Sequence, residues 1–303
     1  MKETILLTGG SGLLALNWAV QKRDNYNVIL GLHEREISLS GVESIKINLD
    51  SEVDFGDILK RIKPDLVIHT AGLTSVEACE KNPELANHVN VDLARNVASA
   101  TAQLGIKMVQ ISTDHLFAGD KPFMNENDPV EPCNLYGSTK AAAEIAVGIN
   151  PESLIVRTNF YGWGPGYRKS FSDVIISTLS AGKQIVLFEN VFYSPILVET
   201  LVDAVHDLID LDASGTFNIV SGERISKHQF GLMVARQFNL DENLIKKGLL
   251  QDNLNLVKRP LDMSLSNSKV INLLKSNLKS NEDQLIILHN QKMLKSIEEI
   301  QNL

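Results

Sequence analysis

Several residue patterns that mark common classes of protein are missing from this sequence. It holds two cysteines, Cys79 and Cys133, with no CxxC pair and no pair of histidines nearby at metal-ligand spacing. We therefore expect neither a disulfide framework nor a metal site. No apolar run approaches the roughly 20 residues that a membrane helix needs, and the run at 4–7 is too short for a signal peptide. These absences predict a cytoplasmic protein without a membrane partner.

The sequence also has no excess of positive charge. Lys and Arg number 29 against 37 Asp and Glu, which gives a formal net charge of -8. Contacts to nucleic acid or to an anionic membrane surface need clustered Lys and Arg, so this balance disfavours both partners. A local basic pocket for one small anionic ligand remains compatible with it.

Short apolar runs, by contrast, are plentiful and alternate with longer helical patterns. Six of them have the pattern of strands, at 4–10, 27–33, 44–50, 66–72, 107–113 and 153–159. Most lack polar alternation, as the strands of a parallel sheet do when helices cover both faces. The segments between them place apolar residues at helical spacing. This alternation predicts an α/β fold, a Rossmann-type doubly wound parallel sheet.

Beyond residue 158 the alternation of strand-like and helical segments changes, and we expect a smaller C-terminal region. Glycine and aromatic residues cluster after Arg157, and strand-like and helix-like stretches then follow in irregular order. We assign 1–158 to an NAD(P)-binding domain that also receives about 184–215. Residues 159–183 and 216–275 are assigned to the smaller region, and 276–303 to a helical tail.

The turn after the first predicted strand indicates a dinucleotide. It has the sequence TGGSGLLA (8–15) and opens a helix. Gly9 and Gly12 allow a tight turn and a close backbone approach, and the free N–H groups of a helix start bind a pyrophosphate. Many turns of this kind need glycine for their geometry alone. The inference of a dinucleotide site therefore depends on the position of this turn directly after the first predicted strand.

The end of the second predicted strand bears on the choice of cofactor. The segment GLHER (31–35) has no acidic residue directly at the strand end, where the NAD fingerprint has one. Arg35, with His33, could instead pair with a 2′-phosphate, because a guanidinium matches phosphate geometry. The alternative is a solvated charged turn. We expect a preference for NADP(H), with NAD(H) possible.

A tyrosine and a lysine in YGSTK (136–140) form a candidate acid–base pair. On a helix, Tyr136 and Lys140 lie one turn apart on the same face. A free phenol has a pKa of about 10, and a nearby ammonium would lower it towards the operating pH. The spacing alone arises easily by chance. Thr113, however, ends another predicted strand, at the sheet edge where ligands bind in such folds.

Several segments together resemble the extended short-chain dehydrogenase/reductases, most closely the dTDP-4-dehydrorhamnose reductase branch. They are TGGSGLLA, AGLTSVEACEKNPELANHVNVD, ISTDHLFAGDKPFMNENDPVEPCNLYGSTKAAAE, RTNFYG and RPLDMSLSNSK. The resemblance implies that Tyr136 is the catalytic acid, that Lys140 holds the nicotinamide ribose and lowers the tyrosine pKa, and that Thr113 orients the keto oxygen. The cofactor contacts that it implies are Gly9, Gly12, Leu13 and Leu14 at the phosphate turn, Asn48 and Leu49 at adenine, and Ala71, Gly72 and Thr74 beside strand four.

Some positions depart from the pattern of that branch, mostly on the substrate side. His115 stands where the branch often has Tyr, and Phe160 where the reductase has Trp near its substrate. The segment 188–195 stands where an Asp-Gln pair is common. The resemblance implies that the smaller C-terminal region is substrate-binding. We expect Phe160 and Arg259 to contact the substrate, with Arg259 reaching a diphosphate. The departures leave the identity of the sugar open.

These observations together predict NAD(P)H-dependent reduction of a 4-keto-6-deoxy nucleotide-sugar, in deoxysugar or surface polysaccharide biosynthesis. One alternative is an epimerase or dehydratase of the same family, although no further acid–base pair is evident beside Thr113. Another alternative is a non-catalytic, NADP-binding regulatory subunit that keeps the fold. A homodimer is possible, since the resemblance implies it, but the sequence shows no interface pattern.

Overall fold

A seven-stranded parallel sheet organises the larger part of the molecule. The computed structural model describes residues 2–253, 255–295 and 297–303. The strand order is β11-β6-β5-β4-β1-β2-β3, and every neighbouring pair is parallel. The strands are β1 (Thr4–Thr8), β2 (Asn27–Leu32), β3 (Glu43–Lys46), β4 (Leu66–His69), β5 (Lys107–Ile111), β6 (Leu154–Arg157) and β11 (Gly215–Asn218).

The central strands are buried along almost their whole length, as the unbroken apolar runs predict. All four residues of β4 and of β6 are buried, and so are four of the five in β1 and in β5. Chain order reverses beside β1, because β4 lies on one side of it and β2 on the other. The doubly wound α/β prediction is therefore confirmed, and the crevice at this reversal is where such sheets bind ligands.

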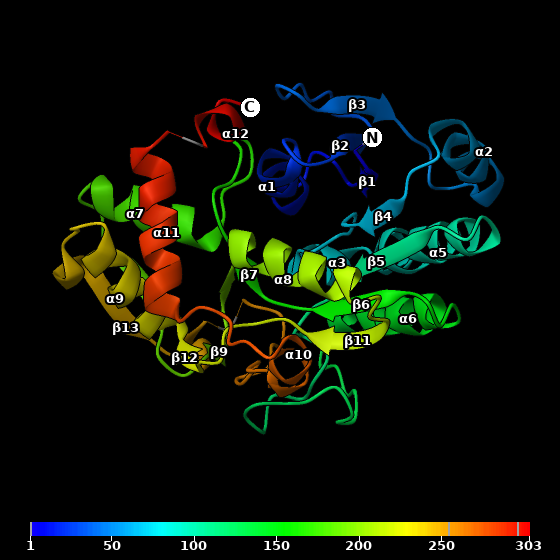
Figure 1. Cartoon of the computed structure of the whole chain (residues 1–303). Coiled ribbons are helices and arrows are strands. Elements are labelled where there is room, and N and C mark those ends of the chain that lie inside the picture. The colour runs from blue at the N-terminus through cyan, green and yellow to red at the C-terminus, as the bar shows by residue number, and fades with distance from the viewer. Residues whose placement is uncertain (1, 254, 296) are drawn as a thin grey trace.

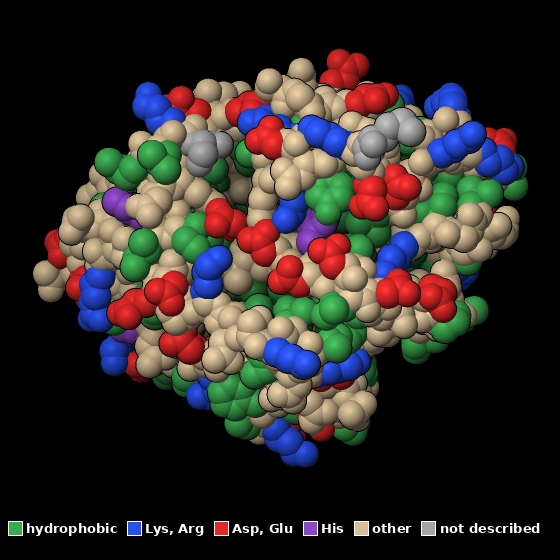
Figure 2. Space-filling view, viewed as in Figure 1, with side chains coloured by type: hydrophobic (Ala, Val, Ile, Leu, Met, Phe, Trp, Pro, Cys, Tyr) green, Lys and Arg blue, Asp and Glu red, His purple; other side chains and the backbone are tan. Residues whose placement is uncertain are grey.

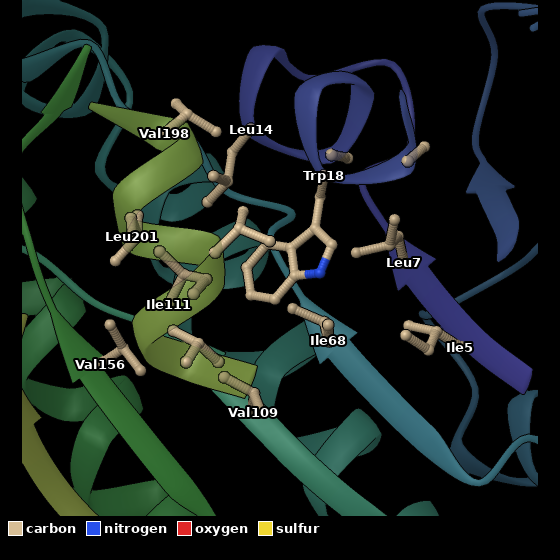
Figure 3. Close-up of a cluster of buried hydrophobic side chains, with 14 of the residues drawn as sticks. Ile5, Leu7, Leu14, Trp18, Ile68, Val109, Ile111, Val156, Val198 and Leu201 are labelled. Carbon is tan, nitrogen blue, oxygen red and sulfur yellow. The ribbon is translucent and has the colours of Figure 1, made fainter. Parts of the chain in front are cut away.

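Helices cover both faces of this sheet (Figure 1). One face packs against α1 (Leu13–Lys22) and α8 (Val198–Asp210), and Figure 3 shows the Trp18 indole between these helices and the strands. The other face packs against α2 (Glu52–Ile62), α5 (Leu93–Gln103) and α6 (Leu135–Gly148). The shorter elements are α3 (Val76–Lys81), α4 (Pro83–Asn87), the π-helical turn η1 (His88–Asp92) and α10 (Ser268–Leu274).

A smaller region lies to the left of the main sheet in Figure 1 and has a separate apolar cluster. Its strands form only pairs, which are β7 (Phe160–Tyr161) with β10 (Ile196–Leu197), β9 (Phe192–Tyr193) with β12 (Ile225–Ser226), and β8 (Ile185–Phe188) with β13 (Ile245–Gly248). Its helices are α7 (Phe171–Ser180), α9 (Lys227–Gln237) and α11 (Asn281–Met293), with short turns η2 (Glu242–Leu244) and η3 (Leu250–Asp252). Serine caps with reciprocal side-chain bonds begin α7 and α9.

Two strands lie in a different part of the molecule from the one that we expected. The segment 184–215 was assigned to the NAD(P)-binding domain, and α8 within it does pack on the main sheet, but β8 pairs with β13 in the smaller region. The segment 216–275 was assigned to the smaller region, but β11 at its start is the edge strand of the main sheet, next to β6. A four-residue apolar run has the same appearance in either sheet, so its partner is decided by packing.

The C-terminal tail holds the two parts of the fold together. Helix α11 packs on the smaller region, where Trp163 Nε1 donates a hydrogen bond to the Leu288 carbonyl. The short α12 (Glu298–Gln301) returns to the main domain, where Arg23 pairs with Glu299. Positive and negative side chains are interspersed on the face seen in Figure 2. Within the described residues no helix is long and apolar enough to cross a membrane.

We expect the core under α1 to make stability depend on pH. Trp18 Nε1 donates a hydrogen bond to His206 Nε2 at 3.1 Å, which requires that nitrogen to be unprotonated. Burial lowers the pKa of His206 to about 4, with Lys22 adding to the shift and Asp203 opposing it. The unfolded chain takes up this proton below about pH 6.5, so folded stability is complete above that pH and falls as pH drops towards 4.

Between pH 7 and pH 5 the free energy of unfolding should fall by about 2 kcal/mol less in the His206→Gln variant than in the parent protein. Urea unfolding at the two pH values measures this difference. His33→Gln, at an exposed position, serves as the control and should follow the parent protein. Equal pH dependence in all three proteins would contradict this role of His206.

Candidate active site

The glycine turn is shaped by a close backbone contact. Gly9 has a φ of 68°, and a Cβ there would lie 2.7 Å from the backbone of Ala71. Any other residue would therefore need both a strained conformation and a displaced neighbour. Gly12 is the N-cap of α1, which has neither a side-chain cap nor an acidic residue in its first turn. Such a helix start is suited to a pyrophosphate.

A cavity of about 320 Å³ runs from this turn to the ends of the central strands. Its walls bring together residues that the sequence predicted separately. They are Gly12, Leu13, Leu14, Ala71, Gly72, Thr74, Thr113, Tyr136, Lys140 and Phe160. Parallel strands place their carboxyl ends at one edge of the sheet, and that shared edge explains why segments distant in sequence meet here.

Thr113, Tyr136 and Lys140 are all buried at the cavity wall, each less than a tenth exposed. Tyr136 and Lys140 lie on α6, which begins at the N-cap Asn134, whose side chain accepts a hydrogen bond from the Gly137 amide. A Cβ on Gly137 would lie 2.3 Å from the His115 carbonyl oxygen, so only glycine lets α6 approach the end of β5 this closely.

The pKa of Tyr136 shifts in the opposite direction from the one that we expected. Burial raises the pKa of the phenol to about 12, whereas the Thr113 hydroxyl and the Arg168 charge act to lower it. Burial also lowers the pKa of Lys140 to about 8, with Glu144 opposing the shift. Lys140 Nζ donates a hydrogen bond to the Ile111 carbonyl at 2.7 Å. Desolvation by burial is the largest of the effects on the phenol, so its pKa lies above the ordinary value rather than below it.

The residues expected near the adenosine half of the cofactor differ from one another in exposure and in contacts. Arg35 and His33 are exposed just beyond β2. The Arg35 guanidinium lies 3.9 Å from the ring centroid of Tyr167, whose hydroxyl donates to the Ser11 carbonyl in the glycine turn at 2.7 Å. Arg35 is thereby held beside this turn, where a 2′-phosphate could be reached.

Asn48 and Leu49, expected at adenine, follow β3. Asn48 is exposed and its side chain accepts a hydrogen bond from the Asp50 amide, whereas Leu49 is buried in the core beneath α2 and α5. The exposed Asn48 is thus accessible to a ligand, and the Leu49 side chain is engaged in packing.

Arg259 lies outside the cavity wall, unlike Phe160. It forms an ion pair with Glu77, while its Nε is buried without a partner among the described residues. The charge of Arg259 nevertheless acts to lower the pKa of His115, which lines the cavity. Arg259 is therefore close to the substrate side of the site without lining the cavity itself.

Three polar residues around the cavity were not singled out from the sequence. Asn90 bonds the Leu73 backbone and donates to Thr139 Oγ1, which joins the loop after β4 to α6. Asn159 donates to Asp114 Oδ2, and Arg168 donates to Thr74 Oγ1 across the cavity. Each reads in the sequence as an ordinary loop or helix residue, because its partner lies far along the chain.

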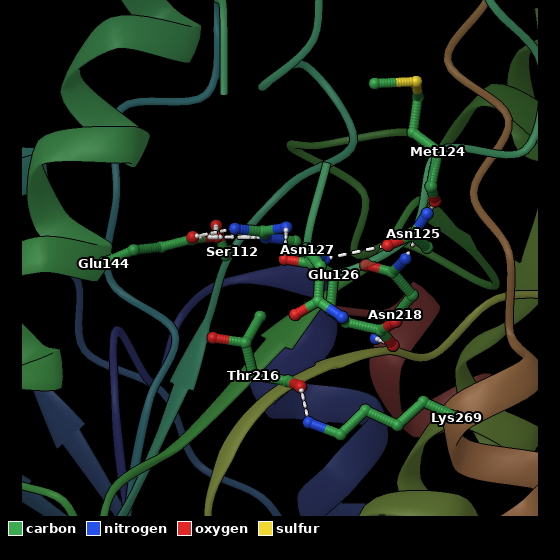
Figure 4. Close-up of polar contacts among 10 residues, drawn as sticks. Ser112, Met124, Asn125, Glu126, Asn127, Glu144, Thr216, Asn218 and Lys269 are labelled. Atoms are coloured by element: carbon green, nitrogen blue, oxygen red, sulfur yellow. Dashed lines mark hydrogen bonds and ion pairs between the residues drawn. The ribbon is translucent and has the colours of Figure 1, made fainter. Parts of the chain in front are cut away.

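A buried ion pair behind the site joins α6 to the sheet. Arg157 at the end of β6 donates to both carboxylate oxygens of Glu144, which lies one turn beyond Lys140 on α6. Ser112 Oγ, beside Thr113, donates to the same carboxylate. Arg157 Nη1 also donates to the Glu126 backbone carbonyl, and the Glu126 carboxylate accepts a hydrogen bond from the Asn218 amide of β11. Figure 4 shows Glu144, Ser112, Glu126 and Asn218 in this network. The network holds the catalytic candidates on β5 and α6 in one arrangement.

Within the described residues no group of three or more His, Cys, Asp or Glu is arranged to hold a metal ion. The cavity wall combines Gly12 of the glycine turn, the hydroxyl groups of Thr113 and Tyr136, and the cations Lys140, Lys169 and Arg168.

Comparison with known proteins agrees with this description. The model of the RmlD substrate binding domain family matches residues 1–291. The chain belongs to this family. The family lies within the extended short-chain dehydrogenase/reductases, so the resemblance noted in the sequence is confirmed.

Three relatives span most of this RmlD-family chain. A probable low-salt glycan biosynthesis reductase of Haloferax volcanii is 28% identical over 93% of this chain and 96% of its own length. The structure of a dTDP-4-dehydrorhamnose reductase from Bacillus anthracis in complex with NADP has a TM-score of 0.84 at 25% identity, covering 96% of this chain and all of that one (100%). Subunit beta of methionine adenosyltransferase 2 from Bos taurus is 26% identical over 80% of this chain and 74% of its own length. RmlD-family proteins use nicotinamide cofactors.

The Glu144→Ala variant should be destabilised by about 3–5 kcal/mol, because it leaves the Arg157 charge buried without its carboxylate. Chemical denaturation at neutral pH measures the loss. Glu152→Ala removes an exposed carboxylate four residues beyond α6 and should change stability by less than about 0.5 kcal/mol. Similar stability of the two variants would contradict the importance assigned to the pair.

Proposed function

We propose that this protein is a reductase of a 4-keto-6-deoxy nucleotide-sugar that prefers NADP(H), with NAD(H) as a weaker alternative. The observation that carries the proposal is the single cavity that joins the glycine turn to Thr113, Tyr136 and Lys140. The NADP-bound relative and the glycan reductase relative support the same chemistry.

The side chains of the cavity have suitable protonation states for carbonyl reduction. A bound nicotinamide would supply the hydride to C4 of the sugar. Thr113 would donate a hydrogen bond to the keto oxygen, and Tyr136 would donate its proton there as the alkoxide develops. A phenol pKa of about 12 keeps Tyr136 protonated at neutral pH, as a proton donor has to be. Lys140 would hold the cofactor ribose.

Surroundings on the substrate side support a nucleotide-sugar without naming it. Phe160 offers an apolar surface in the cavity, and Arg259 has a buried Nε without a partner among the described residues. A keto sugar needs both an apolar contact and anion recognition for its diphosphate. The identity of the sugar depends on His115, Phe160 and 188–195, where this chain departs from the reductase branch. Epimerase or dehydratase activity remains the alternative within the family.

A second candidate function is that of a regulatory subunit. It is favoured by the similarity to subunit beta of methionine adenosyltransferase 2, which is about as identical to this chain as the reductases are. Retention of Thr113, Tyr136 and Lys140 in one cavity favours the enzyme instead. Tight NADPH binding without oxidation by any keto sugar would support the subunit.

The Tyr136→Phe variant should lose at least about 100-fold in kcat, because it lacks the proton donor. NADPH oxidation with a panel of dTDP-, UDP-, GDP- and CDP-4-keto sugars measures turnover, and fluorescence titration measures cofactor binding. Cofactor affinity should stay within about twofold. Tyr26→Phe, at the opposite end of the strands, is the control and should keep full activity. Retained turnover in the Tyr136→Phe variant would contradict the role of Tyr136 as the proton donor.

The Arg35→Ala variant should weaken NADPH binding about tenfold and change NADH binding little, since only NADPH carries the 2′-phosphate. Titration of the two cofactors against the same preparation compares them directly. Arg95→Ala, an exposed arginine on α5 that pairs with Asp92, is the matched control. An equal effect on both cofactors would argue against Arg35 as the basis of NADP preference.

A further inference from the structure

Lys227 is a cation for which the fold provides no anionic partner in contact. It is the first residue of α9, directly after the cap Ser226. Its Nζ lies 3.3 Å from the ring centroid of Tyr193 and 5.0 Å from that of Phe171. Within the described residues Nζ has neither a hydrogen-bond acceptor nor an ion pair. Lys227 is half-buried, and its ammonium lies against two aromatic faces.

This position is an unfavourable one for a positive charge. The start of a helix carries a partial positive charge of its own, so a cation there destabilises the fold. Burial lowers the pKa of Lys227 to about 8, Asp114 opposes that shift, and Arg259 adds to it. Two cations therefore repel each other here. A residue kept at such a position is expected to have a role in binding rather than in stability.

The surroundings of Lys227 belong to the substrate side of the active-site cavity. Phe171, Asp114 and His115 line the cavity, and the Lys227 charge acts to lower the pKa of His115. Three polar atoms in this neighbourhood are buried without a partner among the described residues: Arg259 Nε, His115 Nδ1 and the Tyr193 hydroxyl. Buried polar groups are normally paired, so these indicate a ligand or water in the working protein.

We propose that Lys227 binds an anionic group of the substrate beside Arg259, and that Lys227 thereby determines substrate affinity. This proposal rests on the function proposed above, since it assigns the pair to the substrate of that reaction. The ligand chemistry is that of phosphate or carboxylate oxygens, which could come from the diphosphate or from an acidic sugar. A guanidinium fixes the orientation of such a group, and the flexible lysine stem lets Nζ move from the Tyr193 ring to the oxygen.

Ligand binding to the NADP-loaded protein tests this proposal without requiring turnover. The probes are dTDP, UDP, UDP-glucose and UDP-glucuronate, titrated calorimetrically. Lys227→Met, which keeps the apolar stem, should raise the Kd of the anionic probes about ten- to a hundredfold. Lys227→Arg should retain most of the affinity. Lys247→Met, on an exposed lysine of β13 that pairs with Glu189, should change nothing.

The pattern across the probes distinguishes the two sources of the anion. An equal loss with all probes that bind assigns Lys227 to the diphosphate. A loss confined to UDP-glucuronate, with UDP and UDP-glucose unaffected, assigns it to a sugar carboxylate. Unchanged affinities in Lys227→Met, or no binding of any probe by the parent protein, would overturn the proposal.

Thermal unfolding separates a binding role from a packing role. Removing an unfavourable charge should leave the Tm of Lys227→Met equal to or above that of the parent while affinity falls. A lowered Tm together with weaker binding would indicate packing and would overturn the proposal. If no keto sugar is reduced but binding still depends on Lys227, the reductase function fails and the anion site stands.

Discussion

Helix α6 carries two of the three candidate catalytic side chains, and its position depends on a carboxylate buried between it and the sheet. Glu144 accepts hydrogen bonds from Arg157 on β6 and from Ser112 at the end of β5. A buried charge that loses its partner is strongly destabilising, so the helix and the two strands keep one relative arrangement. Because Thr113 directly follows Ser112, the geometry of the hydroxyl groups follows from this ion pair.

The site itself retains charges that the fold only partly compensates. Lys140 donates to a backbone carbonyl, Lys227 lies against aromatic rings, and Arg259 shares a partly exposed pair with Glu77. Burial shifts the pKa of both lysines to about 8. Such unfavourable electrostatics are typical of sites where binding energy from a cofactor and an anionic substrate completes the interactions.

Much of the main sheet could be predicted because its strands are locally distinctive. Uninterrupted apolar runs revealed six strands, and the ends of those strands located Thr113 and the glycine turn. The apolar runs did not predict the sheets that β8 and β11 join, because a short apolar run has the same appearance in either sheet. The direction of the Tyr136 pKa shift was also missed, since the neighbouring lysine is visible in sequence and the depth of burial is not.

The sequence by itself determined the fold class, the glycine turn and the family, because each rests on residues that are close together or follow a fixed chain order. Tertiary structure alone decided the substrate side of the site. Lys227, Asp114 and Arg259 lie far apart along the chain, and each has an unremarkable local context. Only packing of the smaller region against the main sheet brings these charges together, and interactions between charges depend on their distance and burial rather than on sequence spacing.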